Sequence, residues 1–171
     1  MISLTRLTPD DAPLLEKIGG RTLLESHGHS APAHIMQEYV DRSFSEEACR
    51  AELADEKNIF SAIFYNSKPA GYSKIVFDYA HPAVSFTPVT KMERLYLLKE
   101  FYELKLGQQL MQQAIDLSKA NGDKGMWLNV WKKNERAIRF YQKQGFQTIG
   151  ESEFVLTPAH SNPNWVMLLT Y

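Results

Sequence analysis

The sequence predicts a single α/β domain, and three of its features support that prediction. The chain has 171 residues, of which 44% are hydrophobic, so residues 1–171 suffice for one buried core. Residues 126–146 have the pattern of a strand, a helix and the start of another strand. Residues 59–77 hold two β-rich runs separated by a short polar turn.

The chain begins with a predicted strand and a predicted helix. Met1–Leu7 alternates polar and apolar residues well enough to form a first strand. Thr8 is suited to cap a helix, because Pro9 follows at the first helical position and two acids then face the positive end of the helix dipole. The pair Gly19-Gly20 is expected to loosen or bend this helix.

A loop is predicted from Ser26 to Pro32, and a second helical region from His34 towards Asp55 with a break around residues 43–45. Three histidines lie in and beside this loop, but no recognisable ligand spacing accompanies them, so no metal site is predicted. Seven acids and two bases lie between His34 and Glu56. This excess fits an acidic rim that attracts a cationic substrate, but an ordinary solvated helix face is the favoured interpretation.

The middle of the chain is predicted to alternate strands and loops. Three strands are expected, at Ile59–Tyr65, Ala70–Phe77 and Lys91–Leu98. The first two form an antiparallel hairpin because only four residues separate them. Asp78–Thr90 holds two prolines and no helical period, which indicates a loop. A helix follows the third strand and ends at Asn121-Gly122.

The last third contains the strand–helix–strand unit. Trp127, Asn129 and Trp131 alternate with apolar residues, as in a strand. Asn134 suits a helix N-cap, and Gly145 is placed to end the helix in a left-handed conformation. Three further segments are then expected: a strand at Phe146–Leu156, a proline-containing turn at Thr157–Asn164 and a strand at Trp165–Thr170.

Composition and charge exclude several classes of protein. The 19 basic and 20 acidic residues give a formal net charge of −1, which argues against a nucleic-acid partner. The single cysteine, Cys49, allows no internal disulfide and fits a packed thiol in a reducing cytoplasm. No leader-like N-terminus and no membrane-length apolar run is seen. A cytoplasmic protein without a membrane partner is expected.

One motif identifies a family. Asn134-x-x-Ala137-x-x-Phe140-Tyr141, followed by Gly145-Phe146, resembles the second cofactor motif of the GNAT N-acetyltransferases. The resemblance implies a GNAT-like single domain with a central mixed, mostly antiparallel sheet flanked by helices on both faces. It implies that acetyl-CoA is the co-substrate, contacted by Asn134, Glu135, Arg136 and Ala137. It also implies that Tyr141 stands near the thioester sulfur and donates a proton to the leaving thiolate. The same pattern would also arise if these residues had only structural roles, with Asn134 as a helix cap, Ala137 and Tyr141 as packed side chains and Gly145 as the end of the helix.

The helix after Lys91–Leu98 adds a second resemblance. In the family this helix starts with Gln/Arg-x-x-Gly-x-Gly/Ala, whose backbone N–H groups hold the pyrophosphate of CoA. The window Tyr102–Gly107 keeps the final glycine, but Tyr102 replaces Gln or Arg and Lys105 replaces the first glycine. Lys105 is expected to be tolerated with a negative φ and to add its charge to the phosphate. The implied cofactor contacts are Glu103, Leu104, Lys105, Leu106, Gly107 and Gln108, with the backbone of Leu95, Tyr96 and Leu97 along the pantetheine arm.

The reaction implied is direct acetyl transfer to a primary amine of a small molecule. Glu93 is the expected general base, since relatives often carry a carboxylate there, although a paired structural acid fits equally. The sequence resembles the PaiA-type spermidine/spermine acetyltransferases within the family, so a polyamine is one candidate acceptor, and peptide N-termini and amino acids are others. A non-catalytic CoA-binding or interaction module, or an acyltransferase for a longer acyl chain, remains open. Exposed aromatic residues in Phe146–Leu156 allow a homodimer.

Overall fold

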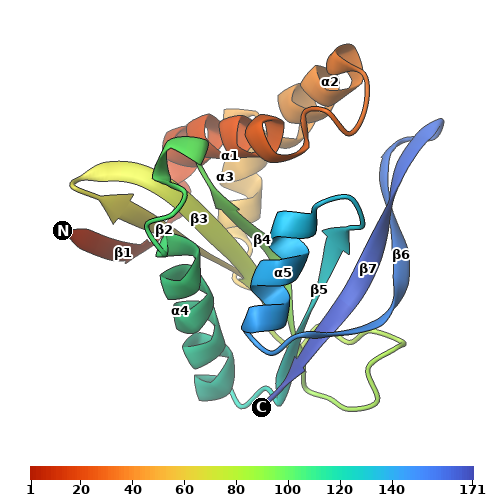
Figure 1. The fold of residues 1–171 in the computed structure, drawn as a ribbon. Coiled ribbons are helices and arrows are strands. Elements are labelled where there is room, and N and C mark those ends of the chain that lie inside the picture. Colours follow the sequence, from red (N-terminus) through yellow and green to blue (C-terminus); the bar gives the residue numbers. More distant parts are fainter. The chain divides into compact units, whose positions relative to one another are not determined.

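The computed structural model describes all 171 residues and divides into two compact units. Unit 1 comprises Met1–Ile75 and Arg94–Ala114, and unit 2 comprises Val76–Glu93 and Ile115–Tyr171. The seven strands are hydrogen-bonded in the order β1-β2-β3-β4-β5-β7-β6 (Figure 1). The boundary between the units falls within β4, between Glu93 and Arg94, so each unit contains part of this strand.

The order of elements matches the alternation that the sequence predicts. The strands are β1 Ile2–Arg6, β2 Asn58–Tyr65, β3 Lys68–Val76, β4 Thr90–Leu97, β5 Gly125–Trp131, β6 Gln147–Thr157 and β7 His160–Thr170. The helices are η1 Pro9–Asp11, α1 Ala12–His27, α2 Ala33–Ser43, α3 Glu46–Ala54, η2 Lys99–Phe101, α4 Leu106–Ala120 and α5 Glu135–Lys143. None of these helices is long and apolar enough to cross a membrane.

In unit 1 the first helix begins as predicted and continues through its glycines. The backbone N–H of Thr8 donates to Asp11 Oδ2 at 2.8 Å, as part of a capping box. Helix α1 then runs without a break through Gly19 and Gly20. A Cβ at Gly19 would lie 2.4 Å from the Phe44 ring. The glycine pair therefore allows close packing against Phe44 and Val40, and the loosening or bend expected there stays a prediction.

The same helix extends past the predicted start of the loop. Ser26 and His27 form its last turn, so His27 is a helical residue and not a loop residue. The predicted hairpin is confirmed, with Asn66 and Ser67 at its turn in left-handed conformations (φ 48° and 66°). Strand β1 pairs antiparallel with β2, with Ile2 opposite Tyr65.

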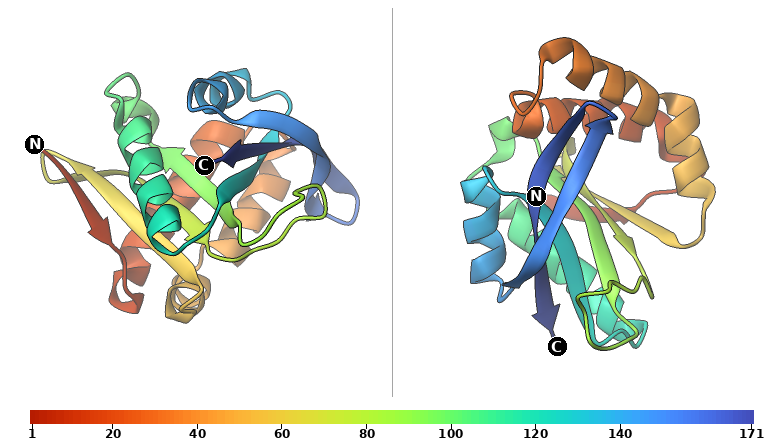
Figure 2. Two further views of the ribbon diagram at one scale, coloured as in Figure 1. Left: turned by 90° about the horizontal axis from the view of Figure 1, so that it is seen from below. Right: turned by 90° about the vertical axis from the view of Figure 1, so that its right-hand side faces the viewer.

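In unit 2 the sheet is mixed. Strand β5 runs parallel to β4, with Lys91 opposite Trp127, and antiparallel to β7, which pairs antiparallel with β6. Figure 2 shows helix α5 on one side of β5 and the loop of residues 77–89 on the other. In that loop Val84 and Val89 pack with Trp127 and Val166 as a small buried cluster. The parallel and antiparallel pairings confirm the predicted mixed sheet.

The predicted turn at Thr157–Asn164 is wrong in length. Strand β7 already begins at His160, and Pro163 lies within it opposite Glu153. The carbonyl of Pro163 accepts a hydrogen bond from the backbone N–H of Lys132 at 3.0 Å. A proline is tolerated where the ladder uses its carbonyl, so the residue that suggested a turn is part of a long strand.

Candidate active site

The start of helix α4 in unit 1 is the candidate pyrophosphate site. Glu103, Leu104 and Lys105 precede the helix and are exposed, and Gly107 and Gln108 lie in its first turn. Leu106 is fully buried in a cluster with Leu110 and Phe101, which anchors the helix at its first residue. The first turn of a helix has unpaired N–H donors and a partial positive charge, so this end of α4 suits an anion.

The backbone before α4 differs from the sequence-based expectation. Lys105 has φ 60° and Glu103 has φ 73°, so the expectation of a negative φ at Lys105 is wrong. Left-handed residues turn successive N–H groups towards one side, the arrangement of an anion-binding nest. This geometry explains why a glycine suits position 105, since a residue with a Cβ is strained there. Lys105 lacks the backbone freedom of glycine but adds a positive charge beside the helix start.

In unit 1 the last residues of strand β4 are held in place by the packing of their side chains. Leu95 and Leu97 pack against the cluster that contains Leu106 and Leu110. The Tyr96 ring lies edge-on to His27 at 5.8 Å and 6.1 Å from the Tyr72 ring. These contacts fix the backbone of residues 95–97, the segment expected to run along the pantetheine arm.

A charged cluster lies beside Tyr72 in unit 1. Glu52 accepts hydrogen bonds from Lys74 Nζ at 2.7 Å and Arg94 Nη2 at 3.0 Å. The Arg94 guanidinium also lies 5.0 Å from the centre of the Phe44 ring. Burial raises the pKa of the Tyr72 hydroxyl, although the neighbouring Arg94 guanidinium opposes this. Sequence analysis did not single out this cluster, because its members come from α3, β3 and β4.

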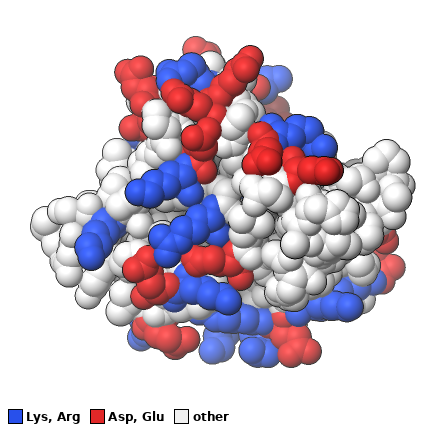
Figure 3. All heavy atoms as spheres, turned by 90° about the horizontal axis from the view of Figure 1, so that it is seen from above, with Lys and Arg blue, Asp and Glu red and all other residues white.

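The ion pairs of Glu52 also bear on the excess of acidic residues between His34 and Glu56. Glu52 is half-buried and neutralised by two cations, and the other six acids are exposed. Glu46 pairs with Arg50 at 3.0 Å. Acidic and basic side chains lie side by side on the face drawn in Figure 3. The count therefore reflects a solvated helix surface together with one half-buried acid, Glu52, that is paired with two cations.

His27 carries a perturbed imidazole in unit 1. Its Nδ1 lies 2.7 Å from Ser26 Oγ. Burial lowers the pKa of His27 to about 4, and His29 contributes a smaller effect in the same direction. His27 is therefore neutral at pH 7. Cys49, by contrast, is 1% exposed and its pKa is raised to about 11 by burial, as expected for a packed thiol.

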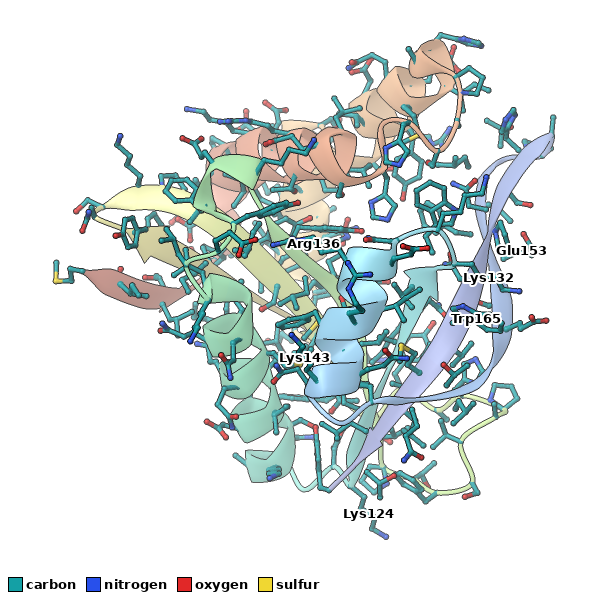
Figure 4. All side chains as sticks on the ribbon, viewed as in Figure 1. Lys124, Lys132, Arg136, Lys143, Glu153 and Trp165 are labelled. Atoms are coloured by element: carbon teal, nitrogen blue, oxygen red, sulfur yellow. The ribbon has the colours of Figure 1, made fainter.

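In unit 2 the start of helix α5 has the predicted cap. Asn134 Oδ1 accepts from the backbone N–H of Ala137 at 3.2 Å. Glu135 and Arg136 are exposed in the first turn, and Figure 4 shows Arg136 at this end of α5 and Lys143 at the other. Gly145 has φ 102°, which confirms the left-handed end of the helix.

Tyr141 lies on the buried side of α5. Its side chain is 8% exposed, and its ring packs edge-on against Phe146 at 5.8 Å and Phe140 at 5.5 Å. The ring is thus held rigidly by its neighbours, which suits either a packed tyrosine or a positioned proton donor.

Glu93 is also in unit 2, and it is paired. Its Oε1 lies 3.7 Å from Lys91 Nζ. Lys91 in turn lies 5.0 Å from the Tyr79 ring centre and 5.1 Å from that of Trp127. Burial and the Lys91 charge both lower the pKa of His81, whose ring is 4.6 Å from that of Trp127. No cluster of three or more His, Cys, Asp or Glu side chains suits a metal ion.

Comparison with known proteins decides the family. A model of the acetyltransferase (GNAT) family matches residues 22–146. The chain belongs to the GNAT family. It is 26% identical over 155 residues to an uncharacterized N-acetyltransferase of Lactobacillus delbrueckii subsp. lactis, covering 91% of this chain and 90% of the relative. It is 28% identical over 159 residues to an uncharacterized N-acetyltransferase of Mycobacterium tuberculosis, covering 92% and 96%.

Two solved GNAT structures share the fold. PaiA N-acetyltransferase from Thermoplasma acidophilum, in complex with coenzyme A, superposes with a TM-score of 0.81 at 19% identity over 100% of this chain and 99% of that one. Ribosomal-protein-S18-alanine N-acetyltransferase from Escherichia coli gives a TM-score of 0.70 at 19% identity over 99% and 94%. The predicted GNAT fold and the prediction of an N-acetyltransferase are both confirmed.

Proposed function

We propose that this GNAT protein transfers an acetyl group from acetyl-CoA directly to a primary amine of a small molecule. The observation that carries the proposal is the start of α4, where left-handed Glu103 and Lys105 precede the first turn of the helix, whose N–H groups have no partner within the helix. The similar PaiA structure contains coenzyme A, which supports the same cofactor here. The negative charge of Glu103 disfavours binding of the CoA pyrophosphate, whereas the positive charge of Lys105 favours it.

Each unit contributes its own residues to this role. In unit 1 the N–H groups from Glu103 to Gln108 hold the pyrophosphate, and the backbone of Leu95, Tyr96 and Leu97 holds the pantetheine arm. In unit 2 Asn134, Glu135, Arg136 and Ala137 form the second cofactor contact, at a helix start that Asn134 itself caps. Acetyl-CoA supplies the activated acyl group, and its binding aligns that group with the amine.

The proton transfers are assigned to two side chains of unit 2. The amine nitrogen forms the new bond to the acyl carbon as the carbon–sulfur bond breaks. Glu93 accepts the proton that the amine loses, directly or through water, and the Tyr141 hydroxyl donates a proton to the departing thiolate. Cys49 takes no part, since its thiol is buried and its pKa is raised to about 11.

The proposed acceptor is a primary amine of one of three candidate classes. A polyamine is one candidate, in line with the similarity to PaiA. The acids between His34 and Glu56 give it little support, because Glu52 is neutralised by Lys74 and Arg94. Amino acids and peptide N-termini are the alternatives, and the similarity to the ribosomal-protein-S18-alanine enzyme favours them. We place the reaction in the cytoplasm, where Cys49 stays reduced.

Replacing Tyr141 with phenylalanine tests the proposed chemistry. Tyr141→Phe should lower kcat about 100-fold, because a positioned acid is lost, while the affinity for CoA stays unchanged. Tyr65→Phe is the control, since Tyr65 packs against Phe101 in the unit 1 core and is assigned no part in the proton transfers. Thiol release and calorimetric titration with CoA give the two readings. Equal turnover in both variants would mean that Tyr141 is only a packed side chain.

A further inference from the structure

Unit 2 contains a buried amide that makes no hydrogen bond through its oxygen. Asn164 on β7 is 6% exposed, and its Oδ1 has no hydrogen-bond partner. Buried polar atoms in folded proteins are nearly always paired, because an unpaired one has lost water without gaining a replacement. Such an atom in the interior of a strand is therefore a candidate acceptor for a ligand.

The cross-strand neighbours of Asn164 are one tryptophan and one serine. Asn164 lies opposite Trp131 on β5 and opposite Ser152 on β6, so these three side chains share a face of the sheet. On the same face Ser152 Oγ donates to Asn129 Oδ1 at 2.9 Å. Asn129 is exposed, Ser152 is half-buried and Asn164 is buried. The row formed by Asn129, Ser152 and Asn164 thus runs from an exposed to a buried residue.

The row offers one acceptor and one donor. Asn164 Oδ1 accepts, whereas the Oδ1 of Asn129 already receives the Ser152 hydroxyl, so Nδ2 is the group that Asn129 presents. An amide group carries the complementary pair, an N–H and a C=O. A single row of uncharged side chains therefore matches an amide better than it matches an ion.

The charged side chains of the same hairpin face the other way. Glu151 lies opposite Trp165 and forms an ion pair of 2.6 Å with Lys132, which stacks on the Trp165 ring at 4.1 Å. Glu153 lies opposite Pro163 and accepts from Ser161 Oγ at 3.0 Å. Figure 4 shows Lys132, Trp165 and Glu153 along this hairpin. Since strand residues alternate, these acids belong to the face opposite Asn164.

We propose that Asn164, with Asn129 and Ser152, forms an acceptor subsite that binds a neutral amide group next to the reacting amine. Asn164 Oδ1 receives the amide N–H, and Asn129 Nδ2 donates to the amide C=O. The acceptor class is then an amino-acid amide or a peptide N-terminus, and a polyamine is disfavoured because an ammonium in this row would meet no carboxylate. This inference rests on the proposed acetyltransferase function.

Two nearly isosteric acceptors test the hydrogen bond to Asn164. Alanine N-methylamide has the amide N–H, and alanine methyl ester has an oxygen in its place. We expect wild-type kcat/KM to favour the amide about 2- to 10-fold, the value of one neutral hydrogen bond. In Asn164→Leu the preference should fall to about one, chiefly through a higher KM for the amide. Spermidine and CoA serve as a further acceptor and a binding control.

Asn162→Leu is the matched control for this variant. Asn162 is 7% exposed, lies on the same strand and face, and is opposite Phe154. It should keep the amide preference. Asn164→Leu should also keep or raise Tm, because an apolar side chain replaces an unpaired polar atom. A residue with only a structural role would lower Tm without changing the ratio of the two acceptors.

Several results would overturn the subsite. One is equal use of amide and ester by the wild-type chain, a comparison that needs no variant. Another is a preference that survives in Asn164→Leu or disappears equally in Asn162→Leu. Transfer to spermidine without transfer to either alanine derivative would refute the amide subsite while leaving the acetyltransferase intact. Failure to consume acetyl-CoA with any amine would refute the proposed function itself.

Discussion

The left-handed conformation of Lys105 leads to a prediction that separates backbone strain from charge. Lys105→Ala and Lys105→Gly both remove the ammonium, but only glycine relieves the strain of φ 60°. A residue with a Cβ costs about 1–2 kcal/mol in this region. Glycine gains about 0.4–1 kcal/mol of freedom in the unfolded chain, which offsets part of that. The glycine variant should therefore be more stable than the alanine variant by about 1 kcal/mol.

Urea unfolding and thermal melting measure this difference. For a chain of this length, about 1 kcal/mol corresponds to a Tm difference of about 2–4 °C. Arg139 is the matched control, because it lies inside helix α5 and pairs with Glu135 at 3.8 Å. There the order should reverse, with Arg139→Ala more stable than Arg139→Gly by about 1 kcal/mol.

The same pair of variants tests the role of the Lys105 charge. Both should bind CoA about 2- to 5-fold more weakly than the wild type, as expected for one exposed cation. Equal stability of the two Lys105 variants, or greater stability of the alanine variant, would show that the chain before α4 does not have this conformation in solution. The account of the pyrophosphate nest would then fail with it.

Three further predictions concern stability and its link to the site. Asn134→Ala should lose about 1 kcal/mol of stability, because the N-cap of α5 is removed, and it should also bind CoA more weakly. Ser45→Ala removes the similar cap of α3, where Ser45 accepts from the N–H of Ala48, and should lose stability without any change in CoA affinity. Equal CoA affinity in the two variants would remove Asn134 from the cofactor site. Glu52→Gln should lower the free energy of unfolding in urea by about 3 kcal/mol, because Lys74 and Arg94 lose a charged partner. The control Glu46→Gln, at an exposed ion pair, should change it by less than about 0.5 kcal/mol. Similar losses in the two variants would argue against the charged cluster. In the unfolded chain His27 binds a proton below about pH 6.5, whereas in the folded chain it does so only below about pH 4. The free energy of unfolding of the wild type should therefore decrease as the pH falls through this window, and in His27→Gln the decrease should be smaller by about 2 kcal/mol at pH 4.5. Parallel curves of stability against pH for the two proteins would mean that the pKa of His27 is not lowered by burial.

Local chemistry made much of the fold predictable from the sequence. The cap at Asn134 and the glycine at 145 depend on neighbouring residues alone, and both are found as predicted. The alternation of Trp127, Asn129 and Trp131 likewise defines β5. Each of these signals lies within a few residues of the structure that it specifies.

The errors come from contacts between distant segments. The close approach of Phe44 to Gly19 could not be predicted, because Phe44 is far along the chain. Pro163 looked like a turn residue, but it lies in a long strand whose position is fixed by β5 and β6. Lys105 gave no sequence signal of its positive φ, because only the family pattern places a glycine there. Tertiary packing overrides local propensity in such cases.

The sequence selects candidate site residues only where a motif marks them, and their roles stay predictions. The family motif pointed to Asn134 and Tyr141. Asn164 escaped notice because a polar residue in a segment with a proline suggested a turn, and its unpaired oxygen is visible only in three dimensions. The signal that was present is the alternation of Asn162, Asn164 and Val166, which places two buried amides on one face of β7.

Calorimetric titration with acetyl-CoA, followed by thiol release on adding a primary amine, tests the central claim most directly. The account predicts saturable binding and amine-dependent release of one thiol for each acetyl group transferred. Absence of binding would contradict it, since Tyr102 and Lys105 would then have disabled the pyrophosphate site. Binding without release on any amine would leave a CoA-binding module in place of an enzyme.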